Sequence, residues 1–293
     1  IAGGLLSVPA PRILVVENIG DWRGPVCIWG ELGAAINIAL ECRGGITNGP
    51  VRDVDQRVRH EAKRRVLEVV RVDTLSPHFR SVTFQGEALA DFNSASFDDH
   101  VKFILDAGGA GPVMRDYTPR HFNRAARELT LEFALHGDGP AANWSAQVQP
   151  GQRVTVAGPR GSFIIPLDYD WHLLAGDETA LPAISRRLEE LPAGSRAMVL
   201  AQVDDPADRR DFASAANVAV QWLDNSDRLL AALRSLDLPR GEGYAWCAGE
   251  ARVVAELRRI LVQEKGHDRH AIRAAAYWKK GIVAHHENLD DPL

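Results

Sequence analysis

The sequence predicts two domains, an antiparallel β-barrel followed by a parallel-sheet α/β domain. Short alternating or β-branched runs separated by turn residues occupy the first part, which is typical of antiparallel sheets and barrels. After residue 168, strand-like runs alternate strictly with helical stretches, and this order indicates a parallel sheet covered by helices. The length of 293 residues suits one large or two modest domains.

The composition is that of a globular protein, with 45% hydrophobic and 25% charged residues. A net charge of -5 gives no basic field for nucleic acid, and no apolar run approaches the roughly 20 residues needed to span a bilayer. The cysteines Cys27, Cys42 and Cys247 are too few and too scattered for a disulfide framework, a zinc site or a four-cysteine iron–sulfur cluster. We therefore expect a soluble cytoplasmic monomer, without membrane insertion, nucleic-acid binding or a protein-bound metal.

Each part of the chain carries its own signal. Residues 1–60 form an extension without sustained periodicity and stay unassigned, although the charged stretch 51–65, with Glu61 and Arg65 at i,i+4, predicts a short solvated helix. The barrel domain, 61–168, has predicted strands at 65–72, 79–84, 100–105, 129–135 and 153–156. The α/β domain, 169–284, has predicted strands at 171–175, 197–203, 218–223 and 244–248, and predicted helices at 180–191, 206–215, 227–236 and 250–264. Residues 285–293 are expected to be a disordered tail.

The segment from Arg115 to Arg120 carries the first chemical signal. On an extended segment Arg115 and Tyr117 lie on one face, so the ring can stack on a flat cofactor while the guanidinium binds a phosphate. This combination suits a flavin nucleotide. An edge strand with a solvated arginine is the alternative that this motif leaves open.

A second signal is the segment 136–144, which follows a strand and leads into a helix-like stretch. Gly139 permits close backbone approach, Pro140 suits a first helical position, and the free N–H groups that follow can receive a pyrophosphate. Trp144 is a candidate to flank an adenine or the flavin ring. A Gly-Pro hairpin with a core tryptophan explains the same residues.

The α/β domain opens with a strand, a turn at Gly176 and a helix start, the position of a phosphate-binding turn. Asp177 and Glu178 would repel a pyrophosphate, so either they turn away and cap the helix, with Thr179 or Asp177 at the N-cap, or dinucleotide binding here is unusual. At the end of the fourth strand, Cys247 is either a neighbour of a nicotinamide ring or a small apolar filler.

Two features bear on the ligands of the α/β domain. Residues 277–281, Tyr-Trp-Lys-Lys-Gly, are either a terminal strand with solvated lysines or a positive lip that attracts an acidic substrate. Asp204 and Asp205 favour the ribose hydroxyl of NADH, whereas Arg209 and Arg210 favour the 2′-phosphate of NADPH, and the sequence does not decide between them.

Six pieces of the chain, in order and spread over residues 65–281, carry a family resemblance. They are DDHVK (98–102), RDYTPR (115–120), HGDGPAANW (136–144), GDETALPA (176–183), AGEA (248–251) and YWKKG (277–281). With these pieces the chain resembles the siderophore-interacting proteins, FAD-dependent ferric-siderophore reductases of the ferredoxin-NADP reductase-like superfamily. Residues 1–60 lie outside the resemblance.

The resemblance implies a six-stranded antiparallel FAD-binding β-barrel and a ferredoxin reductase-like NAD(P)H-binding α/β domain. It also implies hydride transfer from NADH or NADPH to FAD and electron transfer to a ferric siderophore, with no acid–base catalytic side chain. The implied cofactor-binding residues are His100, Lys102, Arg115, Tyr117, Thr118, His136, Gly139, Ala141, Ala142, Trp144, Gly176, Asp177, Glu178, Thr179, Gly249 and Glu250. The expected substrate residues are Trp278, Lys279 and Lys280. A reductase serving a ferredoxin or flavodoxin, and a non-enzymatic flavin- and siderophore-binding protein, are the alternatives.

Overall fold

The structure, a computed structural model, describes residues 12–16, 42–47, 56–106, 111–135, 139–282 and 287–289. The chain divides into two compact units, Ile1–Gln56 and Arg57–Leu293. In the described part of the first unit, β1 (Arg12–Val16) pairs in parallel with β2 (Cys42–Thr47). The second unit contains both predicted domains.

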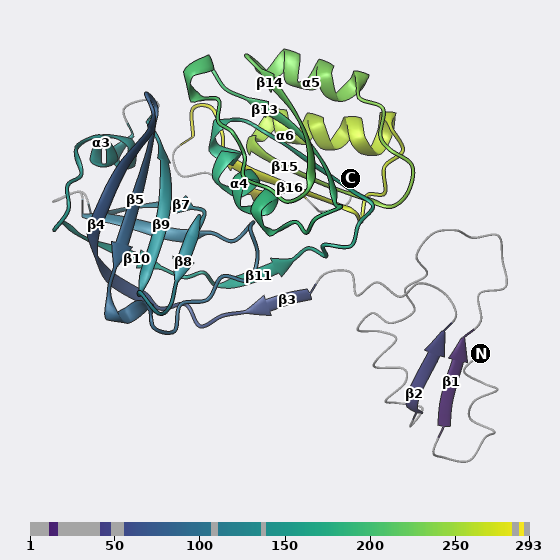
Figure 1. Cartoon of the computed structure of the whole chain (residues 1–293), viewed down its shortest axis with the longest axis horizontal. Coiled ribbons are helices and arrows are strands. Elements are labelled where there is room, and N and C mark those ends of the chain that lie inside the picture. Colours follow the sequence, from purple (N-terminus) through teal and green to yellow (C-terminus); the bar gives the residue numbers. More distant parts are fainter. Residues whose placement is uncertain are drawn as a thin grey trace. The chain divides into compact units, whose positions relative to one another are not determined.

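The first domain of this unit is an antiparallel sheet that curls into a barrel (Figure 1). Its strands are β4 (Arg64–Ser76), β5 (Phe79–Gln85), β6 (Val101–Asp106), β7 (Pro112–Tyr117), β8 (His121–Asn123), β9 (Glu128–Ala134) and β10 (Arg153–Ala157). In the described residues the sheet has seven strands in the order β7-β6-β10-β4-β5-β9-β8, so the predicted barrel is confirmed although its count of six is not exact. Beside it, β3 (Gln56–Arg59) pairs with β11 (Gly161–Ile164).

The barrel core consists of side chains that alternate along the strands between buried and exposed positions. In β4 the side chains of Arg65, Leu67 and Val69 are buried while Val66 and Glu68 between them are exposed, as a sheet with one wet face requires. One end of this core is covered by α3 (Pro140–Gln147).

The solvated helix expected within residues 51–65 is wrong for its described part, which is β3 and the start of β4. The reason is tertiary: Arg65 does not pair with Glu61 but is buried, and its guanidinium donates to the carbonyls of Ala88 and Gly158. Glu61 pairs with Lys63 instead, so the i,i+4 pattern has no helix to stabilise.

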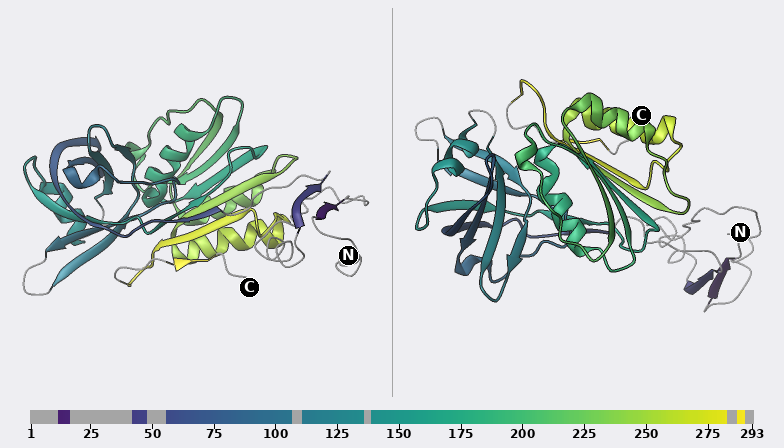
Figure 2. Two further views of the ribbon diagram at one scale, coloured as in Figure 1. Left: turned by 90° about the horizontal axis from the view of Figure 1, so that it is seen from below. Right: turned by 45° about the horizontal axis from the view of Figure 1, so that its top comes forward.

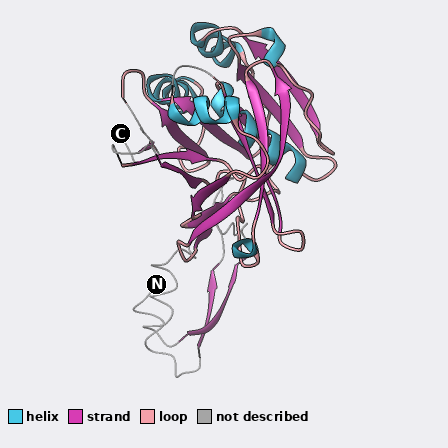
Figure 3. Cartoon of the chain, turned by 90° about the vertical axis from the view of Figure 1, so that its left-hand side faces the viewer, coloured by secondary structure: helices cyan, strands magenta, loops and turns pink. Residues whose placement is uncertain are grey.

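The second domain is an α/β sheet with helices on both faces (Figures 1 and 2), and most of the helical ribbon of the unit lies in it (Figure 3). Its strands are β12 (Trp171–Gly176), β13 (Arg196–Gln202), β14 (Asn217–Leu223), β15 (Gly243–Glu250), β16 (Ile272–Trp278) and β17 (Glu287–Asn288). Its helices are α4 (Leu181–Glu190), α5 (Ser226–Ser235) and α6 (Ala251–Arg259). The last of these, α6, continues into the π-helical turn Ile260–Glu264. The order is β14-β13-β12-β15-β16-β17, parallel except for β17. Among the described residues no helix is long and apolar enough to cross a membrane.

Two expectations for this domain are corrected. The helix predicted at 206–215 is only a 3₁₀ turn, Pro206–Asp208, because the carboxylate of Asp208 accepts hydrogen bonds from Ser76 and His78 at the tip of the β4–β5 hairpin. This contact holds the segment as a loop against the barrel. The tail is not wholly disordered, since β17 adds to the sheet; His285 and His286 lie outside the described residues.

Arg186 on α4 joins the two domains. Its guanidinium donates to the Ser94 hydroxyl at 2.8 Å, the Ser94 carbonyl at 2.9 Å and the Pro119 carbonyl at 2.9 Å, all in the barrel domain. Its Nε also bonds Glu190 one helical turn later. The side chain is buried, so these bonds form where water cannot replace them.

Further contacts reinforce this junction. Glu189 of α4 forms a bidentate pair with Arg120 of the barrel, at 2.8 and 2.5 Å. Asp98 of the barrel accepts from the indole of Trp246 and from the guanidinium of Arg273, both in the α/β sheet. Phe79 and Phe97 of the barrel are buried in the same hydrophobic cluster as Trp246, so the two domains share a core.

We predict that Arg186→Met lowers the free energy of unfolding by about 3 kcal/mol, because it leaves two buried carbonyls without their donor. Chemical denaturation of the purified protein measures this change. Arg228→Met is the control, since Arg228 is 69% exposed in a surface pair with Asp224 and its loss should cost about 0.5 kcal/mol or less. Equal effects of the two substitutions would contradict the role given to Arg186.

Candidate functional site

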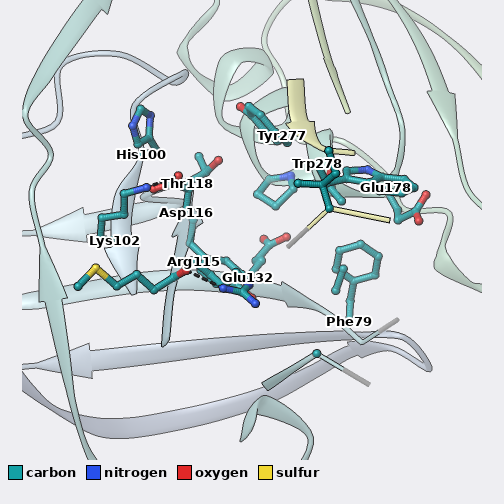
Figure 4. A pocket seen from close by; sticks show the side chains of 17 residues that line it. Phe79, His100, Lys102, Arg115, Asp116, Thr118, Glu132, Glu178, Tyr277 and Trp278 are labelled. Carbon is teal, nitrogen blue, oxygen red and sulfur yellow. Dashed lines mark hydrogen bonds and ion pairs between the residues drawn. The ribbon is translucent and has the colours of Figure 1, made fainter. Parts of the chain in front are cut away.

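A cavity of about 420 Å³ lies between the barrel and the α/β domain (Figure 4). The barrel contributes β5, β6, β7 and β9, and the α/β domain contributes the turn before α4 and the end of β16. The sequence-predicted residues that line it are His100, Lys102, Arg115, Tyr117, Thr118, Gly139, Glu178, Thr179 and Trp278. Lining residues that were not predicted are Phe79, Met114, Asp116, Glu132, Ala134, Pro182, Tyr277 and Ile282.

The barrel wall of the cavity carries paired charges. Lys102 on β6 and Asp116 on β7 are direct cross-strand neighbours, and Lys102 Nζ lies 2.6 Å from Asp116 Oδ2. The other oxygen, Asp116 Oδ1, is buried and has no hydrogen-bond partner among the described residues. It is an acceptor ready for an N–H or O–H group of a ligand.

Arg115 and Tyr117 are oriented differently from each other. One guanidinium nitrogen of Arg115 donates to the Met114 carbonyl at 2.8 Å, and in the described part of the chain the side chain forms no salt bridge. The Tyr117 ring packs on Phe133 at 4.3 Å and Phe103 at 5.7 Å between centroids, and burial raises the pKa of its hydroxyl. Arg115 is therefore available to an anion. Tyr117 lines the cavity, but its ring also packs in the core of the barrel.

The second motif begins α3. Gly139 is the N-cap and Pro140 opens the helix. Among the described residues no side chain caps it, so its first backbone N–H groups keep the capacity to bind an anion. Trp144 packs on Phe103 at 4.8 Å and Phe133 at 5.6 Å, as the core-tryptophan alternative describes. Ala141, Ala142 and Trp144 do not line the cavity, and His136 lies outside the described residues.

The two acids of the turn before α4, Asp177 and Glu178, have different environments. Asp177 is buried and accepts four hydrogen bonds from described residues: two from Thr179, one from the Glu250 N–H at 2.9 Å and one from the Trp278 indole at 2.9 Å. Burial raises the pKa of Asp177 although these donors oppose the rise. The turn therefore follows the capping alternative, with Asp177 at the N-cap.

Two predicted glycines serve this packing. Gly249 has φ +139°, and a Cβ there would lie 2.4 Å from Asp177 Oδ2. A Cβ on Gly176 would lie 2.2 Å from the Ala248 carbonyl oxygen. Both positions require glycine because backbone and carboxylate approach so closely. Neither lines the cavity, and the same holds for Asp177 and Glu250.

Of the two acids of the turn, Glu178 is the one that lines the cavity (Figure 4). Burial, followed by the charges of Asp177, Asp204 and Asp208, raises its pKa to about 7. Near neutral pH this group can therefore both hold and release a proton.

The end of β16 forms the opposite wall. Tyr277 hydrogen-bonds Thr118 of the barrel, and burial raises the pKa of its hydroxyl well above the usual range. Trp278 is 37% exposed, with its indole N–H on Asp177 and its ring in the cavity wall. Lys279 and Lys280 follow outside the lining, and the Lys280 N–H lies 3.4 Å from the Glu250 carboxylate.

Cys247 is not part of the site. It is fully buried on the sheet face covered by α5 and α6, and burial raises the pKa of its thiol to about 12. The apolar-filler interpretation is the one observed.

This architecture, a barrel joined to a parallel α/β domain with a cavity at the junction, defines a ferredoxin reductase-like protein. A solved ferredoxin NADP+ reductase from Neisseria gonorrhoeae shares the fold at 13% identity, with a TM-score of 0.52 and coverage of 74% of this chain and 100% of that one. Residues 68–111 and 106–163 match the siderophore-interacting FAD-binding domain, and residues 169–281 match the siderophore-interacting protein model. The chain belongs to the siderophore-interacting protein family.

Individual proteins similar to this chain support the family assignment. An NADPH-dependent ferric-chelate reductase of Escherichia coli K12 is 36% identical over 245 residues, 76% of this chain and 96% of the relative. A ferric vibriobactin reductase of Vibrio cholerae is 32% identical over 251 residues, 76% of this chain and 93% of the relative. A siderophore utilization protein from T. fusca superposes with a TM-score of 0.74 at 33% identity, covering 79% of this chain and 98% of that one.

We predict that Glu178→Gln changes stability in a pH-dependent way. The folded pKa of about 7 exceeds the ordinary 4.5, so the stability present below pH 4.5 is lost as pH rises through 7 and Glu178 ionises. The variant lacks this loss, so at pH 8 it should be about 1 to 2 kcal/mol more stable than the parent and nearly equal at pH 4.5, allowing for solvent screening. Chemical denaturation at both pH values measures the difference, with Glu87→Gln as an exposed control. A pH-independent offset would refute the assignment.

Proposed function

We propose that this protein is an FAD-dependent oxidoreductase that takes electrons from NADPH and reduces ferric siderophores. The observation that carries the proposal is one cavity bounded by the Arg115–Thr118 segment of the barrel and by Glu178, Thr179 and Trp278 of the α/β domain. Such a junction brings a barrel-held flavin and an α/β-held nicotinamide together. The family membership and the reductases among the relatives support it.

The cavity wall has chemistry that fits FAD. We assign Arg115 to a phosphate, Asp116 Oδ1 to a donor of the ring or the ribityl chain, and Lys102 with His100 to the groove edge. Gly139 and the start of α3 are assigned to the pyrophosphate, and Tyr117 and Thr118 to the ring. We keep Ala141, Ala142, Trp144 and His136 as contacts for the rest of the cofactor. When bound, FAD supplies two-electron acceptance and one-electron release.

NADPH is the proposed reductant. Thr179 and the turn from Gly176 would receive the nicotinamide half, with Gly249 and Glu250 behind them. A second cavity of about 250 Å³ shares Glu132 with the first and is lined by Arg209 and Phe212. Ser185 also lines it, and its hydroxyl is buried and has no partner among the described residues. We assign the adenosine 2′-phosphate to this second cavity, with Arg209 as its cation.

Trp278, Lys279 and Lys280 are the proposed substrate lip, where two cations follow an aromatic ring of the cavity wall. Siderophores bind through hard oxygen donors that suit Fe(III) better than Fe(II), so reduction weakens their hold on iron. We further propose that the protein acts in the cytoplasm, because its three cysteines form no disulfide pattern. We also propose that it is a monomer.

Anaerobic stopped-flow spectroscopy tests the function. NADPH should bleach the flavin of the purified protein, and a ferric siderophore should restore its colour while Fe(II) is trapped by a chelator. A flavin that neither NADPH nor NADH reduces would overturn the proposal. Reoxidation by a ferredoxin or flavodoxin but by no ferric siderophore would favour the alternative reductase.

Arg115→Ala should weaken FAD binding about 10- to 150-fold, the loss of about 1.5 to 3 kcal/mol expected for one charge-assisted phosphate contact. Flavin content after dialysis and titration of the apoprotein with FAD measure the affinity. Arg153→Ala, which removes a 73% exposed arginine of the same barrel, is the control. Equal flavin retention in the two variants would place the phosphate elsewhere.

Arg209→Ala should raise the KM for NADPH about 10-fold and leave the KM for NADH unchanged, because only NADPH carries the 2′-phosphate. Initial rates with both nucleotides provide the comparison, and Arg228→Ala on α5 is the matched surface control. A parallel loss with both nucleotides would show that Arg209 does not select between them.

A further inference from the structure

The proposed reaction leaves one proton to be removed. A hydride brings two electrons and one proton into the cavity, and two ferric ions each take one electron. Per turnover, NADPH and two ferric siderophores therefore give NADP+, two ferrous ions and one proton. A group of the protein that accepts this proton must lie in the cavity and be able to ionise near neutral pH.

Other titratable groups that line the cavity are bound to cations or have pKa values far from neutral. Both carboxylate oxygens of Glu132 accept from arginines, Oε1 from Arg120 at 3.1 Å and Oε2 from Arg210 at 2.5 Å. Asp116 is paired with Lys102. Burial raises the pKa values of the Tyr117 and Tyr277 hydroxyls. His100 is exposed, on the opposite side of the cavity from Glu178 (Figure 4).

We propose that Glu178 accepts the proton that the flavin releases as its electrons pass to ferric iron, and hands it to water. This inference rests on the proposed function. Glu178 is the ionisable residue of the turn before α4 that lines the cavity, and its side chain is only partly buried. The cofactor thus carries the electrons, and a side chain of this chain carries the proton.

The surroundings of Glu178 suit this role. Negative charges act on it from its own turn, by Asp177, and from the loop after β13, by Asp204 and Asp208. Across the cavity, the charge of Glu132 is offset by Arg210, while the adjoining walls, Pro182 and Trp278, are uncharged. Burial first, and then the charges of these acidic neighbours, favour the protonated form of Glu178 and raise its pKa to about 7. A carboxyl group poised there takes a proton as readily as it returns one.

Glu178→Gln in the FAD-loaded protein is the test, with Glu178→Asp as the conservative variant and Glu87→Gln as the exposed control. In the Gln variant, the limiting rate of bleaching at saturating NADPH should stay within about 2-fold of the parent, since hydride entry needs no base. Reoxidation by a ferric hydroxamate siderophore should be about 10-fold slower or more, and its inflection near pH 7 should vanish. The Asp variant should recover part of the rate and the inflection.

A measurement without turnover accompanies these rates. The flavin midpoint potential, recorded by dye equilibration from pH 5.5 to 8.5, should change slope near pH 7 more strongly in the parent protein than in Glu178→Gln, in which only the reduced flavin itself still ionises. Unchanged reoxidation, an unchanged slope, or an equal slowing of bleaching and reoxidation would each overturn the role of Glu178. If the parent flavin is not reduced by NADPH or not reoxidised by ferric siderophore, the proposed function itself fails.

Discussion

The buried carboxylate of Asp177 is the interaction on which the cavity depends. It receives N–H and O–H groups from its own turn after β12, from the β15–α6 junction at Glu250 and from Trp278 at the end of β16. Removing a carboxylate from water costs several kcal/mol unless such donors replace the lost hydration. These hydrogen bonds also hold the ends of β12, β15 and β16 together. The cavity wall that these strand ends form is therefore fixed by the hydrogen bonds of one buried carboxylate.

The helix α4 transmits this order to the barrel. Its first turn follows Asp177, and its second half carries Arg186, Arg187 and Glu189, which bind barrel or linker groups. Arg187 donates to the carbonyls of Ile165 and Pro166, the segment that joins the domains. A helix anchored in this way cannot slide without breaking buried charge-assisted bonds. The acidic turn before α4 and β7 therefore keep a defined separation, which the proposed two-cofactor site requires.

Local patterns predicted most of the fold, and long-range contacts explain the exceptions. The barrel strands and the α4 stripe of Leu181, Ile184 and Leu188 follow from period-2 and period-3.6 burial, which short windows contain. The loop at 206–215 departs from its helical pattern because the partners of Asp208 lie about 130 residues earlier in the chain.

The same distinction holds for the site: contacts between neighbours in the sequence could be predicted, and long-range contacts could not. Asp177 as an N-cap was foreseeable from local spacing, whereas its bonds to Glu250 and Trp278 were not. The part played by Asp116 was equally hidden, since only the strand register sets it opposite Lys102.

The two adjacent acids of the turn show that the charge of a folded turn differs from the charge that its residue types suggest. Two carboxylates beside a pyrophosphate look repulsive in the sequence. In the fold, the charge of Asp177 is taken up by donors inside the protein, and that same charge helps to raise the pKa of Glu178 to about 7. Near neutral pH Glu178 is partly protonated, so the turn is less repulsive to an anion than two exposed carboxylates would be. The acidic pair is therefore compatible with the proposed dinucleotide, and Glu178 is the group proposed to accept a proton there.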